Sequence, residues 1–235
     1  MERKRIVVLS GAGISVESGI ETIPGSVLME KASLTAWRER PEEVLEFCNQ
    51  LRSALKHKMP NSAHRLLADM ERDFDMVILT QNVDDLHERA GSTNVIHLHG
   101  DITKVRPEDT FTQDDGFCED DVIDIGYGEI HPGDTGGRNN AQLRPHLVLF
   151  GEPVPFMDKA EGEIESADIL LVVGTKLQVS PTAGLCAYAP EECPIYVIDP
   201  VKPEIRVSGP IHFIEEEATV GIKIFAQAIG FESDD

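Results

Sequence analysis

Short apolar runs alternate with longer amphipathic stretches along most of the chain. The runs are near-continuously apolar and rich in β-branched residues, as is typical of strands buried on both faces. The stretches between them space their apolar residues as helices do. This alternation predicts an α/β fold, with helices on both faces of a parallel sheet. We expect strands at residues 6–9, 76–79, 95–98, 147–150, 169–173, 195–198 and 211–214, and helices near residues 42–56, 62–72, 156–165, 181–187 and 220–229.

One region interrupts this alternation. Residues 101–142 are rich in Asp, Glu, Gly, Thr and Asn and show no clear period, because glycines break it repeatedly. We interpret the region as an insertion, either a small subdomain or a mobile loop, within a large domain of residues 1–100 and 143–235. The length of 235 residues suits one such domain.

Charge and cysteine content limit the partners and the compartment. Asp and Glu outnumber Lys and Arg 42 to 21, for a formal charge of −21, which disfavours nucleic acid and anionic membranes as partners. Residues 6–10 are too short for a signal peptide, so we expect a cytoplasmic protein. No Cys-x-x-Cys pair occurs, which predicts reduced thiols and no zinc. The cysteines are Cys48, Cys118, Cys186 and Cys193.

The first predicted strand runs directly into a glycine-rich turn. Gly11 and Gly13 flank Ala12, and Ser15 follows. Glycine at this point lets the backbone approach a pyrophosphate. Val16, however, stands where the dinucleotide fingerprint G-x-G-x-x-G has its third glycine. From spacing alone, the turn is as consistent with a plain tight turn as with nucleotide binding.

Polar residues also follow the second predicted strand. The segment TQNVDD at residues 80–85 includes Gln81, Asn82 and Asp84. It lies at the carboxyl end of a strand, where open α/β sheets bind their ligands. An alternative is that Asp84 or Asp85 only caps the next helix.

A histidine pair closes the third predicted strand, where His97 and His99 precede Gly100. Side chains two apart on a strand point to the same face. One imidazole near neutral pKa suits general base work. A satisfied core histidine and a metal ligand are the alternatives, although no third ligand lies nearby in the sequence.

Later strand ends carry similar residues. Gly151 and Glu152 follow one run, Gly174 and Thr175 follow another, and Asp199 follows a third. Because the carboxyl ends of parallel strands share one edge of the sheet, these clusters together favour a nucleotide cleft over isolated turns.

In order along the chain, six motifs resemble those of the Sir2 (sirtuin) family of NAD-dependent protein deacylases. The resemblance implies a Rossmann-like large domain that binds NAD, with a small domain inserted in it. The motifs are GAGIS-x-x-SGI at 11–20, TQNVD at 80–84, HLHG at 97–100, LRP-x-x-V-x-FGE, here LRPHLVLFGE, at 143–152, GT-x-x-x-V-x-P at 174–181 and IDP at 198–200.

The resemblance also implies site residues, carried over by motif. Asp84 would bind the nicotinamide carboxamide, His99 would be the catalytic base, and Asp199 would lie by the adenine ribose. Gln81 and Asn82 would hold the nicotinamide ribose. The phosphates and adenosine would be contacted by Gly11, Ala12, Gly13, Gly174, Thr175 and Lys176, with Ser15 also on the cofactor, and an extended acyl-lysine peptide would pair with Val148, Phe150, Gly151 and Glu152.

The implied reaction displaces nicotinamide and moves the acyl group from lysine to ADP-ribose. The acyl-lysine oxygen attacks the sugar carbon, and His99 then takes a proton from the ribose hydroxyls. General base assistance of this kind is worth about a hundred- to ten-thousand-fold.

The chain departs from the family pattern in three places. Ile23 and Pro24 stand where the family has a Phe-Arg pair, and the sequence leaves open whether Trp37, Arg38 or Arg40 replaces them. Neither zinc-binding Cys-x-x-Cys pair is present between Gly100 and Leu143, so the small subdomain is expected to lack zinc. Cys48 and Leu51 replace the Tyr-x-x-Arg of relatives that prefer acidic acyl groups.

Three functions follow as hypotheses. The first is an NAD-dependent lysine deacylase that acts on acetyl or another uncharged acyl group. The second, prompted by the altered residues 23–24, is ADP-ribosyl transfer to protein or NAD hydrolysis. The third is a non-catalytic NAD or ADP-ribose binding protein, which would require His99 to be only structural. The sequence does not indicate the oligomeric state.

Overall fold

A sheet of six parallel strands forms the centre of the computed structural model, which describes residues 3–112, 116–117, 119–205, 207 and 209–232. The strand order is β12-β11-β10-β1-β2-β3, so the order reverses between β1 and β10. Open α/β sheets bind ligands at such a switch point. The strands are β1 (Arg5–Ser10), β2 (Asp75–Thr80), β3 (Val95–His97), β10 (Ile169–Val173), β11 (Ile195–Ile198) and β12 (Ile211–Ile214).

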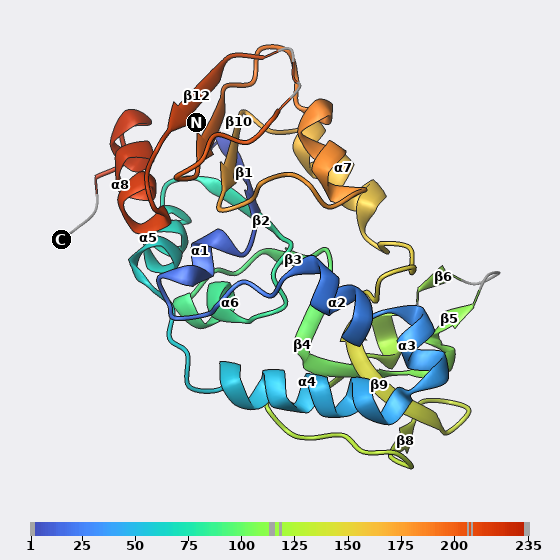
Figure 1. Cartoon of the computed structure of the whole chain (residues 1–235). Coiled ribbons are helices and arrows are strands. Elements are labelled where there is room, and N and C mark those ends of the chain that lie inside the picture. The colour runs from blue at the N-terminus through green and yellow to red at the C-terminus, as the bar shows by residue number, and fades with distance from the viewer. Residues whose placement is uncertain (1–2, 113–115, 118, 206, 208, 233–235) are drawn as a thin grey trace.

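Helices cover both faces of this sheet (Figure 1). On β1, Ile6 and Val8 enter one core and Val7 and Leu9 enter the other, because successive strand side chains point in opposite directions. The predicted α/β fold with a parallel sheet is therefore confirmed. The first face carries α1 (Gly13–Val16), α5 (Ser62–Met70) and α8 (Ala218–Ala228); the second carries α7 (Met157–Glu165) and the 3₁₀ helix η3 (Thr182–Tyr188); α6 (Leu86–Ala90) packs beside α5.

A second, antiparallel sheet lies beside the first. Its strand order is β7-β4-β9-β8, so residues 101–142 contain regular structure within the described part of the chain. Its strands are β4 (Gly100–Pro107), β7 (Ile123–Asp124), β8 (Thr135–Gly136) and β9 (Ala141–Leu147); β5 (Phe111–Thr112) pairs separately with β6 (Gly116–Phe117), and two 3₁₀ turns are η1 (Glu108–Thr110) and η2 (Glu119–Asp121).

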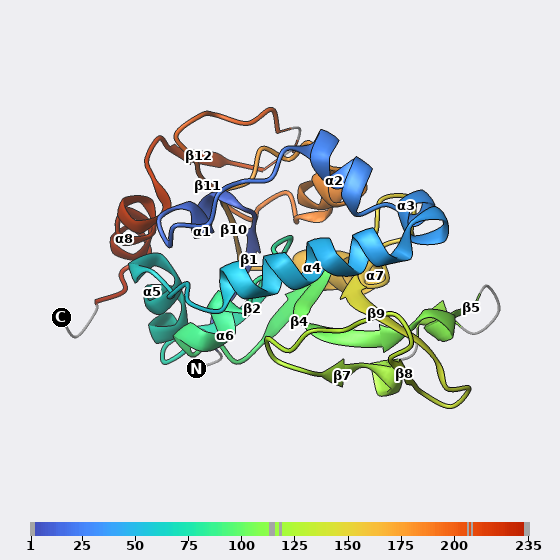
Figure 2. The same cartoon turned by 60° about the horizontal axis from the view of Figure 1, so that its bottom comes forward.

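Three helices from the first quarter of the chain lie beside this second sheet. They are α2 (Gly25–Lys31), α3 (Leu34–Glu39) and α4 (Pro41–Leu55). Helix α4 packs on β4 and β9, and the other two pack on α4. Trp37, Val44 and Cys48 share a buried core with Ile102 and Leu147. We call β4, β7, β8, β9 and α2–α4 together the small lobe, and Figure 2 shows α4 running alongside its sheet.

Residues 147–150 were expected to form a strand of the parallel sheet, and that prediction is wrong. β9 ends at Leu147 in the antiparallel sheet, and Phe150 makes only an isolated bridge to Ser33. The run is apolar because Leu147 and Leu149 enter the core of the small lobe.

No helix in the described residues is long and apolar enough to cross a bilayer.

Candidate active site

The turns after β1 and β10 touch at the switch point. Gly13 N donates to Gly174 O at 2.8 Å, and Gly11 N donates to Val173 O at 3.0 Å. A Cβ on Gly13 would lie 2.5 Å from Gly174 Cα, and Gly174 itself has a φ of +62°. The two backbones approach so closely that only glycine fits at these positions. The amides of Gly11 and Gly13 are therefore engaged within the chain.

A buried polar cluster joins the turn after β1 to the segment after β2. Ser15 Oγ donates to Asp84 Oδ2 at 3.0 Å, and Asn82 Nδ2 donates to Ser15 Oγ at 3.1 Å and to Gly11 O at 3.2 Å. Asp84 Oδ1 also accepts from Leu86 N at 3.2 Å, so this carboxylate both supports the start of α6 and faces Ser15. Burial raises the pKa of Asp84, although the two hydrogen bonds oppose that shift.

His99 lies just beyond β3 and lines a cavity that the polar cluster also lines. Its Nδ1 is 3.0 Å from Gln81 O, and because a carbonyl only accepts, Nδ1 carries the proton and Nε2 keeps its lone pair. Burial lowers the pKa of His99, against the opposing effect of the Gln81 bond. The ring is thus neutral at pH 7 and is able to accept a proton.

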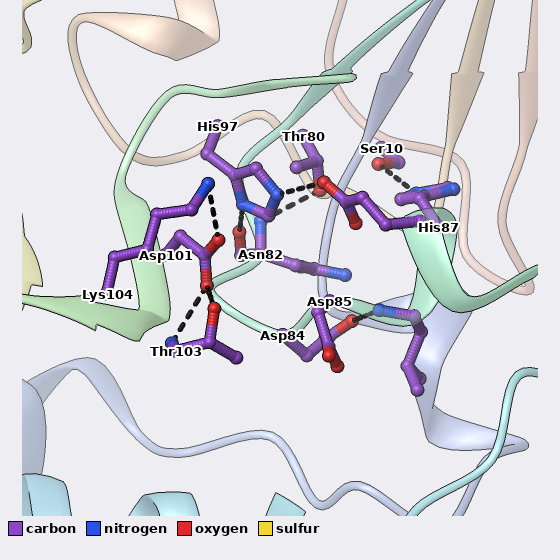
Figure 3. A network of polar contacts seen from close by, with 12 residues as sticks. Ser10, Thr80, Asn82, Asp84, Asp85, His87, His97, Asp101, Thr103 and Lys104 are labelled. Carbon is purple, nitrogen blue, oxygen red and sulfur yellow. Dashed lines mark hydrogen bonds and ion pairs between the residues drawn. The ribbon is translucent and has the colours of Figure 1, made fainter. Parts of the chain in front are cut away.

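His97, in contrast, makes hydrogen bonds at both of its ring nitrogens (Figure 3). Its Nδ1 lies 3.1 Å from Asn82 O and its Nε2 lies 2.7 Å from Glu88 Oε1. Burial lowers the pKa of His97, but the bond to Glu88 and the charges of Glu88 and Asp101 outweigh it, so the pKa is raised. A carbonyl and a carboxylate oxygen accept from the two ring nitrogens, which favours the protonated ring and gives His97 a structural role. His97 thereby holds the segment after β2 at Asn82, and the neighbouring carbonyl of that segment, Gln81 O, accepts from His99.

The other residues predicted for the cofactor lie around the same edge of the sheet. Gln81 Nε2 donates to Thr175 Oγ1 at 3.1 Å, joining the ends of β2 and β10. Asp199 is buried after β11 and accepts from Val201 N at 2.8 Å. Lys176 is exposed to solvent. The edge therefore brings together all of the predicted cofactor residues, with Lys176 on its outer side.

A cavity of about 330 Å³ opens beside His99. One part of its wall is polar and comes from Ser15, Asn82 and Asp84. Most of the remaining wall is apolar and comes from α2, α4 and the segments 20–23, 147–154 and 179–181. Of the predicted site residues, Ala12, Ser15, Gln81, Asn82, Asp84, His99, Val148, Phe150, Gly151 and Glu152 line the cavity, whereas Gly11, Gly13, Gly174, Thr175, Lys176 and Asp199 lie outside its wall.

The loop after β9 is fixed by a buried ion cluster that sequence reasoning missed. Glu152 Oε1 is 2.6 Å from Arg144 Nη1, and Glu152 Oε2 is 3.2 Å from Arg106 Nη2 and accepts from Leu149 N at 2.9 Å. Burial and the neighbouring Arg144 lower the pKa of Arg106 to about 10, against the pull of Glu152. Because Arg106 lies in β4 and Glu152 lies far along the chain, no local pattern could reveal the pairing.

The expected peptide-pairing segment is partly occupied by the chain itself. Phe150 N donates to Ala32 O and Leu34 N donates to Phe150 O, each at 2.9 Å. The Glu152 carboxylate faces the two arginines. Val148 N is likewise engaged, since it donates to His99 O at 3.0 Å. Val148 O and the backbone of Gly151 are therefore the groups of this loop to consider for a bound peptide.

Ile23 and Pro24, which stand where the family pattern has a Phe-Arg pair, lie at the cavity and at the start of α2. Ile23 lines the cavity, and Pro24 immediately precedes α2. Trp37 is buried with its ring 5.3 Å from the Arg144 guanidinium, and Arg40 pairs with Glu43. Within the described residues, Trp37, Arg38 and Arg40 do not line the cavity. None of them takes the place of the Phe-Arg pair.

Metal ligation finds no support in the part of the chain that the structure describes. No group of three or more His, Cys, Asp or Glu side chains there is arranged to hold an ion. Cys118, the cysteine of the inserted region, lies outside the described residues. A small lobe without zinc stays a prediction.

Comparison with known protein families shows to which family this chain belongs. The Sir2 family model matches residues 11–181, which span the switch point, the polar cluster, His99 and the loop after β9. The chain belongs to the Sir2 family. Its Rossmann-like sheet and the order of its motifs are those that the resemblance implied.

Individual Sir2 proteins extend this finding over nearly the full length. An NAD-dependent protein deacylase from Helicobacter pylori strain J99 is 40% identical over 222 residues, covering 92% of this chain and 91% of the relative. One from Bacteroides thetaiotaomicron is 38% identical over 235 residues, covering 96% and 98%. The crystal structure of a Sir2 homologue in complex with NAD superposes with a TM-score of 0.81 at 31% identity, covering 97% and 90%.

Proposed function

We propose that this Sir2 protein is an NAD-dependent protein lysine deacylase. The observation that carries the proposal is the neutral His99, whose proton-free Nε2 belongs to a ring that lines the same cavity as the buried Asp84 carboxylate. A base and a carboxamide acceptor are thereby held at the ligand-binding edge of the sheet. Relatives with 38–40% identity over nearly the full length bear the name NAD-dependent protein deacylase.

The residues at this edge fit NAD. Two glycine turns meet without side chains between them, and the polar cluster supplies a buried carboxylate and amide on the cavity wall. When bound, NAD supplies an electrophilic sugar carbon and a nicotinamide leaving group. Asp84 would accept from the carboxamide, while Ser15 donates to that carboxylate and Asn82 donates to Ser15.

His99 acts as the general base. Its Nδ1–H is fixed on Gln81 O, so Nε2 is the nitrogen that would take a proton from a ribose hydroxyl. His97 and Glu88 hold the neighbouring segment by charge-assisted hydrogen bonds and do not exchange protons with substrate.

The peptide is proposed to add as an extended strand beside Val148 and Gly151. Such pairing gives affinity through backbone hydrogen bonds and demands little sequence. The Glu152 carboxylate positions this loop by accepting from Leu149 N rather than by touching the peptide. The net charge of −21 favours peptides with additional lysines.

The test is product analysis with NAD and an acetyl-lysine peptide. We expect peptide-dependent nicotinamide release, with the acyl group recovered on ADP-ribose, and we expect His99→Ala to lose that turnover while NAD still protects the fold against heat. Peptide-independent NAD breakdown, or ADP-ribose transferred to protein, would instead support the second hypothesis. Unchanged turnover in His99→Ala would remove the base from the proposal.

A further inference from the structure

A tyrosine of the inserted region contacts the large domain next to the buried polar cluster. Tyr127 lies between β7 and β8, and its hydroxyl donates to Asp85 Oδ1 at 2.6 Å. Arg89 Nη1 donates to the same hydroxyl at 3.2 Å and lies 3.5 Å from Asp85 Oδ1. Asp85 immediately precedes α6, and Arg89 lies within it. One side chain of the insertion therefore holds this short helix at both ends.

The two neighbouring carboxylates, Asp84 and Asp85, have different partners. Asp84 accepts from Ser15 Oγ and from Leu86 N, the first amide of α6. Asp85 is the residue before the helix, yet its side chain makes no capping bond, and its carboxylate accepts from Tyr127 instead. The carboxylate that lines the cavity is thus bonded to a helix whose first turn is held from the small lobe.

The loop that carries Tyr127 is itself fixed on the small lobe. Before the tyrosine, Ile125 N donates to Thr103 O at 3.0 Å, which joins the loop to β4. After it, Asn49 on α4 bonds both backbone groups of Ile130: Asn49 Nδ2 donates to Ile130 O at 2.9 Å, and Ile130 N donates to Asn49 Oδ1 at 3.2 Å. Because the loop is anchored on both sides of Tyr127, the position of the small lobe determines where its hydroxyl lies.

The bond between Tyr127 and Asp85 is shielded from water. The side chains of Asp85 and Arg89 are only 19% and 26% exposed, and Tyr127 is half-buried. Burial, and then the bond to Asp85 and its charge, raise the pKa of Tyr127, so the hydroxyl keeps its proton at neutral pH. A hydrogen bond to an ionised acceptor is stronger than one between neutral groups, and a shielded carboxylate has little water to replace a lost donor.

We propose that Tyr127 is a positioning residue for nicotinamide. By holding Asp85 at the start of α6, it keeps the Asp84 carboxylate in the orientation that accepts from the nicotinamide carboxamide. This inference rests on the proposed deacylase function, in which Asp84 is that acceptor. Tyr127 does not line the cavity, so the inserted region contributes to the reaction without touching the ligand.

The first measurement is inhibition by nicotinamide, which as a product returns to the same acceptor. Tyr127→Phe keeps the ring and removes the hydroxyl. The nicotinamide concentration that halves turnover should rise by about threefold or more, which is part of what a hydrogen bond to a charged group contributes. The KM for NAD should rise as well, whereas the KM for peptide should not change. Tyr188→Phe makes the same change at an exposed tyrosine outside the cavity and should leave all of these values unaltered.

A double-mutant cycle tests the route through Asp85. Asp85→Ala removes the acceptor, and it removes no capping bond because the side chain makes none. If Tyr127 acts through Asp85, the double variant should lose no more nicotinamide affinity than the weaker single variant. Thermal melting checks that each protein is folded, and Asp85→Ala serves alone if Tyr127→Phe is not.

Binding measurements separate this inference from the function on which it rests. Calorimetric titration with NAD and with ADP-ribose compares a ligand that has the carboxamide with one that lacks it. Tyr127→Phe should weaken NAD and leave ADP-ribose unchanged, and this comparison holds even if no acyl peptide yields nicotinamide, a result that would defeat the deacylase function alone. A variant that melts earlier with unaltered nicotinamide inhibition and NAD affinity would show a merely structural tyrosine and overturn the inference, as would fully additive losses in the cycle.

Discussion

Ser15 Oγ lies 3.0 Å from Asp84 Oδ2, and this bond ties the turn after β1 to the segment after β2. The first prediction concerns that bond. Ser15→Ala leaves a buried carboxylate with one donor fewer, so stability should fall by about 1–3 kcal/mol. Because the carboxylate also loses its orientation, turnover should fall by at least about tenfold. Urea unfolding and nicotinamide release measure the two effects, with Ser53→Ala on the exposed side of α4 as the control.

The second prediction is the pH profile of turnover. His99 must be unprotonated to act as a base, and burial lowers its pKa below the ordinary value of 6.5. The acidic limb of kcat/KM should therefore lie below pH 6.5, with full base function at neutral pH. Stopped assays from pH 4.5 to 8 with acyl peptide provide the profile. A limb centred above pH 6.5 would contradict the assignment.

The third prediction links stability to pH through His64. Burial lowers the pKa of His64 to about 4, so the unfolded chain binds a proton that the folded chain resists. The stabilisation is present above pH 6.5 and is lost as the pH falls from 6.5 towards 4, by on the order of 3 kcal/mol. His64→Gln, which does not titrate, should make this part of the stability curve shallower in chemical denaturation, and the slope that remains would come from the other buried histidines with lowered pKa values, His87 and His146. His57→Gln, at an exposed position, should leave the curve unchanged.

The fourth prediction concerns the buried ion cluster. Glu152→Gln removes the carboxylate shared by Arg106 and Arg144 and leaves two guanidinium groups together in the core. Stability should fall by about 3–5 kcal/mol, and peptide KM should rise because the neutral amide no longer ties the loop to the two arginines by charge. Glu165→Gln, on the exposed side of α7, is the matched control. A melting temperature equal in the two variants would argue against the cluster.

The fifth prediction distinguishes two glycines. Gly174→Ala forces a side chain into the contact between the two turns at a positive φ, so the protein should lose NAD binding or fail to fold. Gly162→Ala, on α7, meets no atom within 4 Å and should stabilise the protein by about 0.5–1 kcal/mol. Calorimetry and thermal shift with NAD separate the two results.

The parts of the fold that were predictable are those with a local signal. The buried strands are visible in the sequence as apolar runs, and Gly11 and His99 stand at or just beyond their ends. The run at residues 147–150 led to a wrong prediction for the same reason. A segment buried in the small lobe is as apolar as a strand of the parallel sheet, so the sequence does not distinguish them. The partners of Arg106 and the position of Trp37 depend on contacts between distant segments, which no window of sequence contains.

Trp37 is the chain's one tryptophan, and it packs in the small lobe against Arg144 rather than in the parallel sheet. Intrinsic tryptophan emission is therefore a built-in optical probe of that lobe alone. Comparing its denaturation curve with far-ultraviolet circular dichroism, which also follows the helices on the parallel sheet, would reveal whether the two parts of the molecule unfold in one cooperative step.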